Sequence, residues 1–294
     1  MLEWKAFSSV VSQADWAELA CILNNRQLLA GAEMQQYLNR EINEEDAEFA
    51  VENIRGQISW RKTQMPAGYP FAVSGGNIIQ SADWHDFLPY TFMLLLSTHD
   101  FFDETRINRW NEIAKLFERT VNAFVKLHLG NAINIGSPRI PKEAPKSFQK
   151  CINHVAIQMN ESKGVSPRIS WHKDGGVDVI GWKKLDERPG KIVFLVQCAA
   201  GESWRDKEMI PLESWREWIF FATKPIEVLA FPSIYFIGSY PEEEESWRFC
   251  CQGRLLMDRL RLAAFDSTGL PADLRTAIGD WCDQQLINLS RAAE

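Results

Sequence analysis

The chain has 294 residues and a formal net charge of −7, and 46% of its residues are hydrophobic. This length fits two domains or one large one, and the composition is that of a globular protein with enough apolar side chains to form a core. The negative net charge excludes a protein that coats nucleic acid through bulk positive charge. A local basic groove remains compatible with it.

The six cysteines contain no C-x-x-C pair, so neither a zinc ribbon nor a thioredoxin-type motif is indicated. We interpret all six as reduced thiols of a cytoplasmic protein. The N-terminal residues lack the basic and apolar regions of a signal peptide. The most apolar stretch, Phe87 to Leu96, is shorter than the ~20 residues that cross a bilayer, so no membrane partner is expected.

Residues 1–130 are predicted to form a mainly helical N-terminal region. Asp15 precedes a run of apolar residues and is predicted to cap a helix there. Asn43 is predicted to cap another, with Asp46 three residues later at the position where a capping box would carry Glu.

The strongest helical pattern covers Glu104 to Leu129, with apolar residues at steps of three and four, and Gly130 is suited to end that helix. The helical pattern then ends at residues 131–146, which contain three prolines. Each proline lacks the backbone N–H that a helix needs as a hydrogen-bond donor. We interpret this stretch as a linker. A second domain is therefore predicted over residues 147–294.

The second domain has alternating helical and extended patterns. A helix is predicted from Ser147, and LDERPG is predicted to be a turn between the first two strands. The remaining predicted elements are strands at Gly176–Trp182, Lys191–Cys198 and Ile226–Phe231, and helices at Leu212–Phe220, 246–264 and 271–289.

Two polar residues interrupt these apolar strands. Asp178 stands between two valines in GVDVIGW, and Gln197 follows five apolar residues in KIVFLVQC. A strand that apolar is buried on both faces, so each polar group needs a partner or costs ~1–3 kcal/mol. A divalent cation is one such partner, because Mg²⁺ binds carboxylates together with waters and phosphate oxygens.

The pattern Gly176-Val177-Asp178-Val179, followed on the next strand by Gln197-Cys198-Ala199, resembles the PD-(D/E)xK, or restriction-endonuclease-like, superfamily. That family carries an acid on one strand, often as G-x-D-V, and E/Q-x-K on the next. The resemblance covers about residues 147–262. It implies an α/β fold, with a mixed sheet flanked by helices after the helical N-terminal region.

The resemblance also implies roles for individual residues. Asp178 would be the principal ligand of Mg²⁺ or Mn²⁺, and Gln197 would replace the second acid, so the two side chains are expected to converge. The family's lysine, which orients the attacking water and offsets charge on the phosphate, is replaced here by Ala199. Lys207 is the first lysine after the motif and is our candidate for the missing cation.

Several other residues are further candidates for this site. Lys173 and Asp174 lie just upstream of Asp178, and Glu161 is a candidate for the helix-borne acid that some family members use. Cys198 with His172 as its base is an alternative nucleophile, although a cysteine on a core strand is usually inert. Arginines 254, 259 and 261 are interpreted either as phosphate contacts or as part of a solvated helix face.

Simpler interpretations of the two main residues stay open. Asp178 could be a structural acid paired with an arginine, and Gln197 could satisfy backbone groups at a strand end. The predicted function is metal-dependent hydrolysis of DNA by an endonuclease of prokaryotic restriction or anti-phage defence, with a protein partner on the N-terminal region. The alternative is a nuclease-fold protein that has lost catalysis and serves as a subunit of a defence complex.

Overall fold

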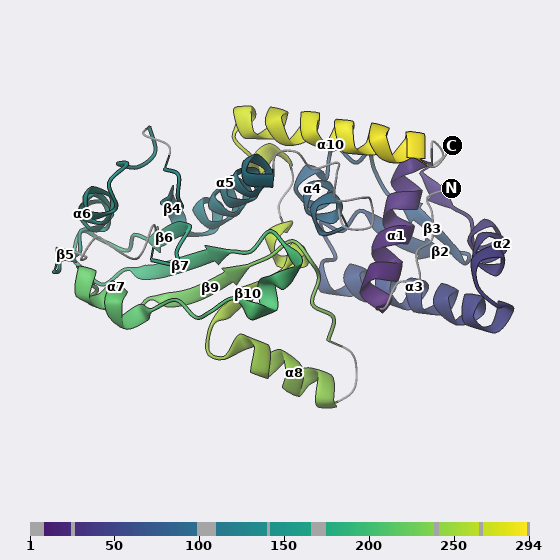
Figure 1. Ribbon diagram of the computed structural model, residues 1–294, viewed down its shortest axis with the longest axis horizontal. Helices are drawn as coiled ribbons and strands as arrows, with labels where there is room; N and C mark the ends of the chain where they lie inside the picture. Colours follow the sequence, from purple (N-terminus) through teal and green to yellow (C-terminus); the bar gives the residue numbers. More distant parts are fainter. Residues whose placement is uncertain are drawn as a thin grey trace. The chain divides into compact units, whose positions relative to one another are not determined.

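The computed structural model describes residues 9–24, 27–98, 110–139, 142–165, 175–237, 241–264 and 267–292. It is a mixed α/β protein with two compact units (Figure 1). The first unit is discontinuous and contains residues 1–109, 232–236 and 258–294. The second contains residues 110–231 and 237–257.

The first unit is mainly helical and also holds a small antiparallel sheet with strand order β1-β3-β2. Gly75 and Gly76 form the turn between β2 and β3, and both have positive φ. A two-residue hairpin turn of type I′ requires positive φ at both positions. Its elements are α1 (Val10–Leu23), β1 (Leu28–Leu29), α2 (Gly31–Glu41), α3 (Glu44–Gln64), β2 (Phe71–Ser74), β3 (Asn77–Gln80), α4 (Leu88–Ser97), α9 (Arg259–Leu262), η4 (Ser267–Gly269) and α10 (Ala272–Ala292).

The second unit contains a five-stranded mixed sheet of order β10-β9-β7-β6-β4. Strands β4, β6 and β7 are antiparallel neighbours, whereas β7, β9 and β10 run parallel. Its elements are α5 (Trp110–Leu129), β4 (Gly130–Asn134), α6 (Phe148–Met159), β5 (Ser162–Lys163), β6 (Val179–Lys183), β7 (Ile192–Cys198), η3 (Glu202–Asp206), α7 (Leu212–Trp218), β8 (Ile219–Phe220), β9 (Ile226–Ala230), α8 (Pro241–Cys251) and β10 (Leu255–Met257).

Helices cover both faces of this sheet. On one face, α6 and α7 form a core with alternate residues of the strands, including Ile180 on β6 and Leu195 on β7. On the other face α5 approaches so closely that a Cβ on Gly181 would lie 2.1 Å from Val125 Cγ1. Because a side chain cannot fit there, Gly181 permits this close packing of helix on sheet.

The predicted capping residues have different outcomes. Asn43 accepts a hydrogen bond from the Asp46 backbone N–H at 2.9 Å, which confirms the cap of α3. The prediction for Asp15 is wrong, because Ser9 caps α1 and Asp15 lies buried within that helix.

Two strands of the five-stranded sheet, β4 and β10, appear where no strand was predicted. The predicted helix over 246–264 is wrong, because α8 ends at Cys251 and β10 follows before α9 begins. Gly253, with a φ of +87°, makes this change of direction possible. The predicted linker over 131–146 also differs from the structure, since β4 pairs with β6 across its first four residues. The compact units divide before α5 instead.

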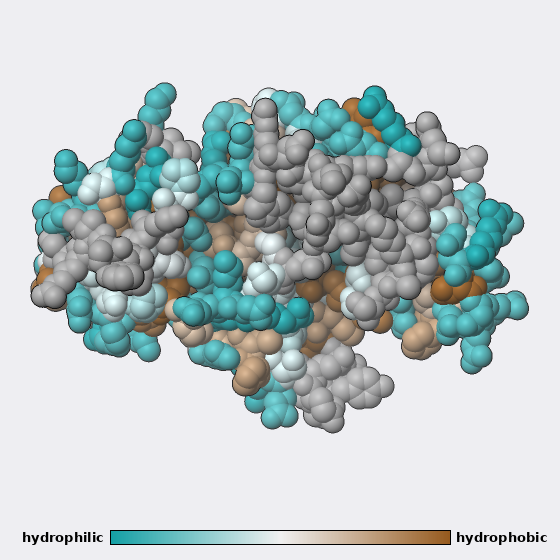
Figure 2. All heavy atoms as spheres, in the orientation of Figure 1, coloured by the Kyte–Doolittle hydropathy of each residue, from teal (hydrophilic) through white to brown (hydrophobic). Residues whose placement is uncertain are grey.

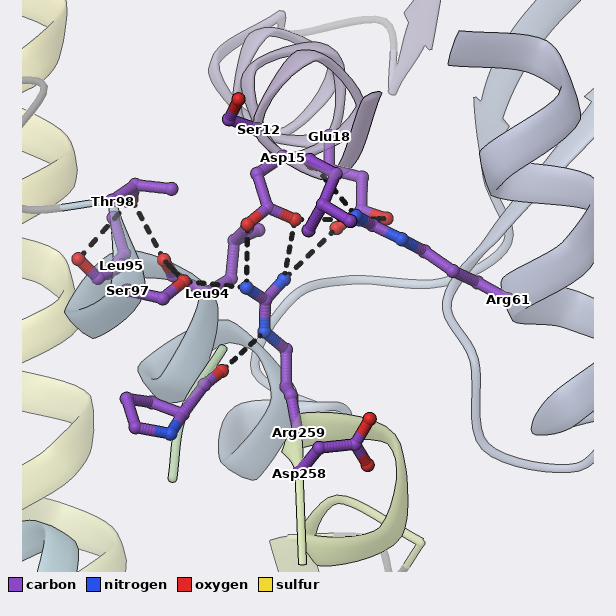
Figure 3. Close-up of polar contacts among 12 residues, drawn as sticks. Ser12, Asp15, Glu18, Arg61, Leu94, Leu95, Ser97, Thr98, Asp258 and Arg259 are labelled. Atoms are coloured by element: carbon purple, nitrogen blue, oxygen red, sulfur yellow. Dashed lines mark hydrogen bonds and ion pairs between the residues drawn. The ribbon is translucent and has the colours of Figure 1, made fainter. Parts of the chain in front are cut away.

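The core of the first unit contains a buried group of charged side chains (Figure 3). Arg259 donates from Nη1 to Asp15 Oδ1 at 2.9 Å and from Nη2 to Asp15 Oδ2 at 2.7 Å. Arg61 Nη1 contacts Asp15 Oδ1 at 2.7 Å and Glu18 Oε1 at 2.6 Å. Two guanidinium groups therefore balance two carboxylates, as buried charges require.

Hydrogen bonds from other groups complete this buried network. The hydroxyls of Tyr69 and Tyr90 both donate to Glu18. Burial raises the pKa of each tyrosine well above its ordinary value, and the negative charge of Glu18 raises it further. Arg259 also donates from Nε to the Pro232 carbonyl at 3.0 Å. Arg259 is thus a core residue and not the phosphate contact considered from the sequence.

None of the described helices is long and apolar enough to cross a bilayer. In the view of Figure 2, hydrophilic and apolar residues are mixed over the described surface.

Candidate active site

Asp178 lies at the point where regular pairing between β6 and β7 ends. Val179 is the register partner of Val196, and the Asp178 N–H donates to the same Val196 carbonyl at 2.8 Å. Two consecutive residues therefore oppose one, which is the pattern of a β-bulge. A bulge changes the direction of a side chain relative to the strict alternation of a strand.

The carboxylate of Asp178 is held by the end of β7. Its Oδ2 accepts a hydrogen bond from the Cys198 backbone N–H at 2.8 Å. Burial raises the pKa of the Cys198 thiol well above its ordinary value, and the charges of Asp178 and Glu118 raise it further. Because the thiolate is disfavoured, the structure argues against Cys198 as a nucleophile. Its proposed base, His172, lies outside the described residues.

Helix α5 brings two charged side chains to this point. Lys115 Nζ contacts Glu118 Oε2 at 2.6 Å, one helical turn apart. A Cβ atom built on Gly136 would lie 2.7 Å from Asp178 Oδ1, 2.8 Å from Glu118 Oε2 and 3.2 Å from Lys115 Nζ. The two carboxylates and the ammonium group therefore converge on the space that Gly136 leaves open, and we refer to these four residues as the Gly136 site.

The position of Gly136 is fixed by the backbone of Asp178. The Asp178 carbonyl accepts hydrogen bonds from the Ile135 N–H at 2.8 Å and the Gly136 N–H at 3.0 Å. These bonds continue the β4–β6 pairing past Asn134 and hold the chain against Asp178. Gly136 is buried, and any larger residue there would occupy the space between the charged groups.

The donor set of the Gly136 site fits a hard divalent cation. Mg²⁺ prefers carboxylate oxygens and is commonly bound through one or two of them, with waters and substrate phosphates completing its shell. Asp178 and Glu118 supply two such oxygens within 3 Å of one point. Among the residues that the structure describes, no group of three or more His, Cys, Asp or Glu side chains is placed to bind a metal. The set therefore fits an ion that keeps much of its water.

Gln197 lies on the other face of the sheet from the Gly136 site. Val193 and Leu195 on β7 belong to the core with α6 and α7, and Gln197 is the next residue in that alternation. Its Nε2 lies 4.0 Å from the Cβ position of Gly176, and its Oε1 is buried and has no hydrogen-bond partner among the described residues. Asp178 directly precedes β6 and Gln197 lies on the adjacent β7, but their side chains do not converge.

Lys207 stands at the end of η3, and its side chain is exposed. Its carbonyl accepts a hydrogen bond from Arg254 Nη1 at 3.2 Å, and its ammonium group forms no ion pair with any described residue. Ala199, where the family's lysine would stand, is buried at the end of β7. Of the two lysines, Lys115 is the one in contact with an acid of the Gly136 site.

Glu161 does not belong to the Gly136 site. Its carboxylate accepts hydrogen bonds from the N–H groups of Gly190 at 2.8 Å, Lys191 at 3.3 Å and Ala222 at 3.2 Å. Gly190 and Lys191 directly precede β7, at the opposite end from Cys198, and Ala222 lies between β8 and β9. Glu161 is therefore a structural acid, and Glu118 is the helix-borne acid beside Asp178. The candidates Lys173 and Asp174 fall outside the described residues.

The sequence contains a pattern that could have identified Lys115 and Glu118 as site residues. Lys115, Glu118 and Asn122 follow one another at steps of three and four, so they share one side of α5. After an amide flip that satisfies its neighbours, the Asn122 side-chain oxygen accepts from the N–H groups of Ile133 and Asn134 on β4. A polar stripe at helical spacing therefore faces the sheet.

Comparisons with protein-family models, with curated proteins and with solved structures find no match for this chain. What the site does must therefore be inferred from its own residues and their geometry.

Proposed function

We propose that this protein is a metal-dependent DNA endonuclease that hydrolyses phosphodiester bonds at the Gly136 site. The observation that carries the proposal is the convergence of Asp178, Glu118 and Lys115 on one open position at a strand end. Two acids with one cation suit phosphoryl chemistry, because the acids can hold a divalent cation and the lysine can stabilise negative charge.

Asp178 and Glu118 are the residues that would hold Mg²⁺ or Mn²⁺. When bound, the ion would polarise the scissile phosphate and make a nearby water more acidic. The Cys198 N–H fixes Asp178 Oδ2, so the orientation of this carboxylate is set before any ligand binds. Such fixed orientation lowers the cost of assembling the reacting groups.

We propose that Lys115 takes the role of the family's strand lysine, whose position is occupied here by Ala199. Its ammonium group lies beside Glu118 at 2.6 Å, where it can offset the negative charge that gathers on a phosphate during hydrolysis. Lys207 remains the second candidate, because it follows the motif and its side chain is exposed. A direct comparison of the two lysines decides between them.

The biological setting is proposed from the resemblance to the restriction-endonuclease-like superfamily. That resemblance favours DNA as substrate and prokaryotic restriction or anti-phage defence as the setting. A cytoplasmic location is proposed because the six cysteines are free thiols. A protein partner is proposed for the helical N-terminal region.

A second candidate function is a nuclease-fold subunit that binds without cleaving. The placement of Gln197 away from Asp178 favours it, since the pairing expected of the family is missing. The Lys115–Glu118 ion pair favours it too, because it already neutralises one of the two acids.

The test is a Mg²⁺-dependent cleavage assay on single-stranded, linear and supercoiled DNA. Asp178→Asn and Glu118→Gln should each lower the rate at least ~10²-fold, and Lys115→Met ~10²–10³-fold, since each removes a group that acts on the reacting phosphate. Glu112→Gln is the control, because it removes an exposed acid from the same helix. Lys207→Met should remain near the wild-type rate.

The outcomes separate the candidates. A strong loss in Lys207→Met with normal Lys115→Met would transfer the cationic role to Lys207. Mg²⁺ binding by wild type but not by Asp178→Asn, without cleavage of any DNA, would favour the binding subunit. If wild type neither cleaves DNA nor binds the metal, the proposed function is wrong.

A further inference from the structure

The segment that follows Gly136 is basic within an acidic chain. Residues 137–150 carry four basic side chains and a single acidic one, whereas the whole chain has a net charge of −7. Pro138 and Pro145 lack the backbone N–H that a regular helix uses, and α6 begins only at Phe148. The basic residues are Arg139, Lys142, Lys146 and Lys150.

Hydrogen bonds hold this basic segment against the end of β4 that carries the Gly136 site. Asn134, the last residue of β4, donates from Nδ2 to Glu143 Oε2 at 3.0 Å. Asn134 is the register partner of Val179, the residue after Asp178. The middle of the basic segment is thereby tied to the strand end beside Asp178.

A second contact fixes the two ends of the segment to each other. Arg139 Nη1 donates to the Lys146 carbonyl at 3.2 Å, and the Arg139 guanidinium lies 5.1 Å from the centre of the Phe148 ring. Arg139 is three residues from Gly136, so Lys146 is linked to the same strand end through one side chain. These contacts fix the positions of Arg139, Glu143 and Lys146 before any partner binds.

The charge that this segment presents outward is positive. Lys142, Lys146 and Lys150 are exposed, and none forms an ion pair with a residue that the structure describes. The one acid, Glu143, is only partly exposed and is engaged by Asn134. Exposed lysines that lack an acidic partner remain available to an anionic ligand.

We infer that residues 137–139 and 142–150 form the surface that binds the DNA backbone on either side of the phosphate held at the Gly136 site. The inference rests on the proposed function, since the two acids of that site are what define a scissile phosphate. A nucleic acid fits because its phosphates recur along the strand, and several lysines along one segment can each neutralise one. Such contacts position the substrate and carry no sequence information.

The test is the salt dependence of binding to a short DNA duplex, measured by fluorescence anisotropy with EDTA so that no cleavage occurs. The variant carries Lys142→Ala, Lys146→Ala and Lys150→Ala together. Each phosphate contact contributes ~0.9 to the slope of log K against log salt, so the slope should become shallower by about 2–3. The substituted side chains are exposed, and circular dichroism verifies that the variant folds.

A matched control removes the same charge from the same unit. Lys163→Ala, Lys183→Ala and Lys224→Ala together change three exposed lysines near the opposite end of the sheet. This control should keep the wild-type slope. If both triple variants change the slope equally, or neither changes it, the inference is wrong.

Failure of the inference is distinguishable from failure of the proposed function. If the first triple variant keeps the wild-type slope of log K against log salt and Asp178→Asn loses cleavage, the basic segment does not bind the DNA backbone. The nuclease proposal would then still hold. A slope that falls only in the first triple variant supports the surface even if wild type proves unable to cleave. If wild type shows no salt-dependent binding to DNA, the partner of this segment is not nucleic acid and the inference fails.

Discussion

Each unit of the protein gathers two carboxylates around basic side chains, but the two groups differ in charge balance and exposure. In the first unit, Asp15 and Glu18 face two guanidinium groups, and Arg61 and Arg259 have side chains with no exposed surface. In the Gly136 site, two carboxylates, Asp178 and Glu118, lie near one lysine, Lys115, which pairs with Glu118; the side chains of Lys115 and Glu118 are 23% and 12% exposed.

This difference separates a structural group from a candidate site. A buried group must satisfy its own charges, because any imbalance in a low-dielectric core is costly. The network around Arg259 does so with two tyrosine hydroxyls and a backbone carbonyl in addition. The four residues of the Gly136 site carry two carboxylates and one ammonium group, and the side chains of Lys115 and Glu118 are partly exposed. A pair of carboxylates at such a position is suited to bind a divalent cation.

The largest expected effect comes from breaking the buried group. Arg259→Met should lower the free energy of unfolding of the first unit by about 3–5 kcal/mol, because Asp15 would remain buried beside one guanidinium instead of two. Urea unfolding followed by circular dichroism measures this loss. Arg248→Met is the control, since its pair with Glu244 is exposed and such pairs contribute ~0.2–1 kcal/mol. Similar losses in both variants would contradict the comparison.

The next effect concerns the imbalance in the Gly136 site. Mg²⁺ at about 100 times its Kd should stabilise the second unit by ~2.7 kcal/mol, since it binds the folded state only. Asp178→Asn should abolish this stabilisation. Asp186→Asn, which removes an exposed acid of the same unit, should keep it. Thermal unfolding with and without Mg²⁺ gives the result, and an equal shift in all three proteins would mean that the ion binds elsewhere.

Filling the open position should have a smaller but more specific effect. In Gly136→Ala the new methyl group would lie within 3 Å of both carboxylates, so the side chains must move at a cost of about 1–3 kcal/mol. Because the two carboxylates are displaced in Gly136→Ala, the stabilisation by Mg²⁺ should be lost in this variant. Gly279→Ala is the control, because nothing lies within 4 Å of its Cβ position on α10 and an alanine there should stabilise by up to ~1 kcal/mol. Retained stabilisation by Mg²⁺ in Gly136→Ala would exclude this position as the metal site.

The smallest effect is expected at acid pH, since it involves a single carboxyl group. Burial acts to raise the pKa of Asp15, but the guanidinium groups of Arg259 and Arg61 outweigh it and hold the pKa below its ordinary value. Asp15 therefore stabilises the fold above an unfolded pKa of ~3.9 and loses this contribution as the pH falls through the lower folded value. In Asp15→Asn, the free energy of unfolding measured with urea should decrease less steeply as the pH falls into the acid range. If the decrease is as steep as in wild type, other carboxylates cause the loss of stability in acid.

Much of the second unit's fold could be predicted from the sequence because its central strands are strongly apolar. The runs in β7 and β9 identify buried strands in any context. By contrast, β4 and β10 are edge strands of five and three residues, GNAIN and LLM. Short edge strands depend on pairing with a neighbour, which local propensity does not encode. The prolines after β4 also led to a predicted domain boundary at residues 131–146, whereas the compact units divide before α5.

The candidate site was predicted only in part. Asp178 was identified because a carboxylate in an apolar strand requires a partner. Gln197 was assigned to the same site through the resemblance, although the alternation with Leu195 places it on the other face. The bulge that turns Asp178 toward α5 is a property of pairing and leaves no local signal. Lys115 and Glu118 were missed because charged residues on a helix usually belong to its solvated face.

The ion pair between Asp15 and Arg259 joins residues that are 244 positions apart in the chain. A ribosome adds ~5–20 residues per second, so Asp15, Glu18 and Arg61 emerge at least about ten seconds before Arg259 exists. During that interval the nascent N-terminal region holds two acids and one guanidinium, and its core lacks the charge that balances it. The residues of the second unit are all synthesised within this interval. Completion of this buried group is therefore coupled to synthesis of the second unit, and a chain truncated before residue 259 would lack the guanidinium that pairs with Asp15.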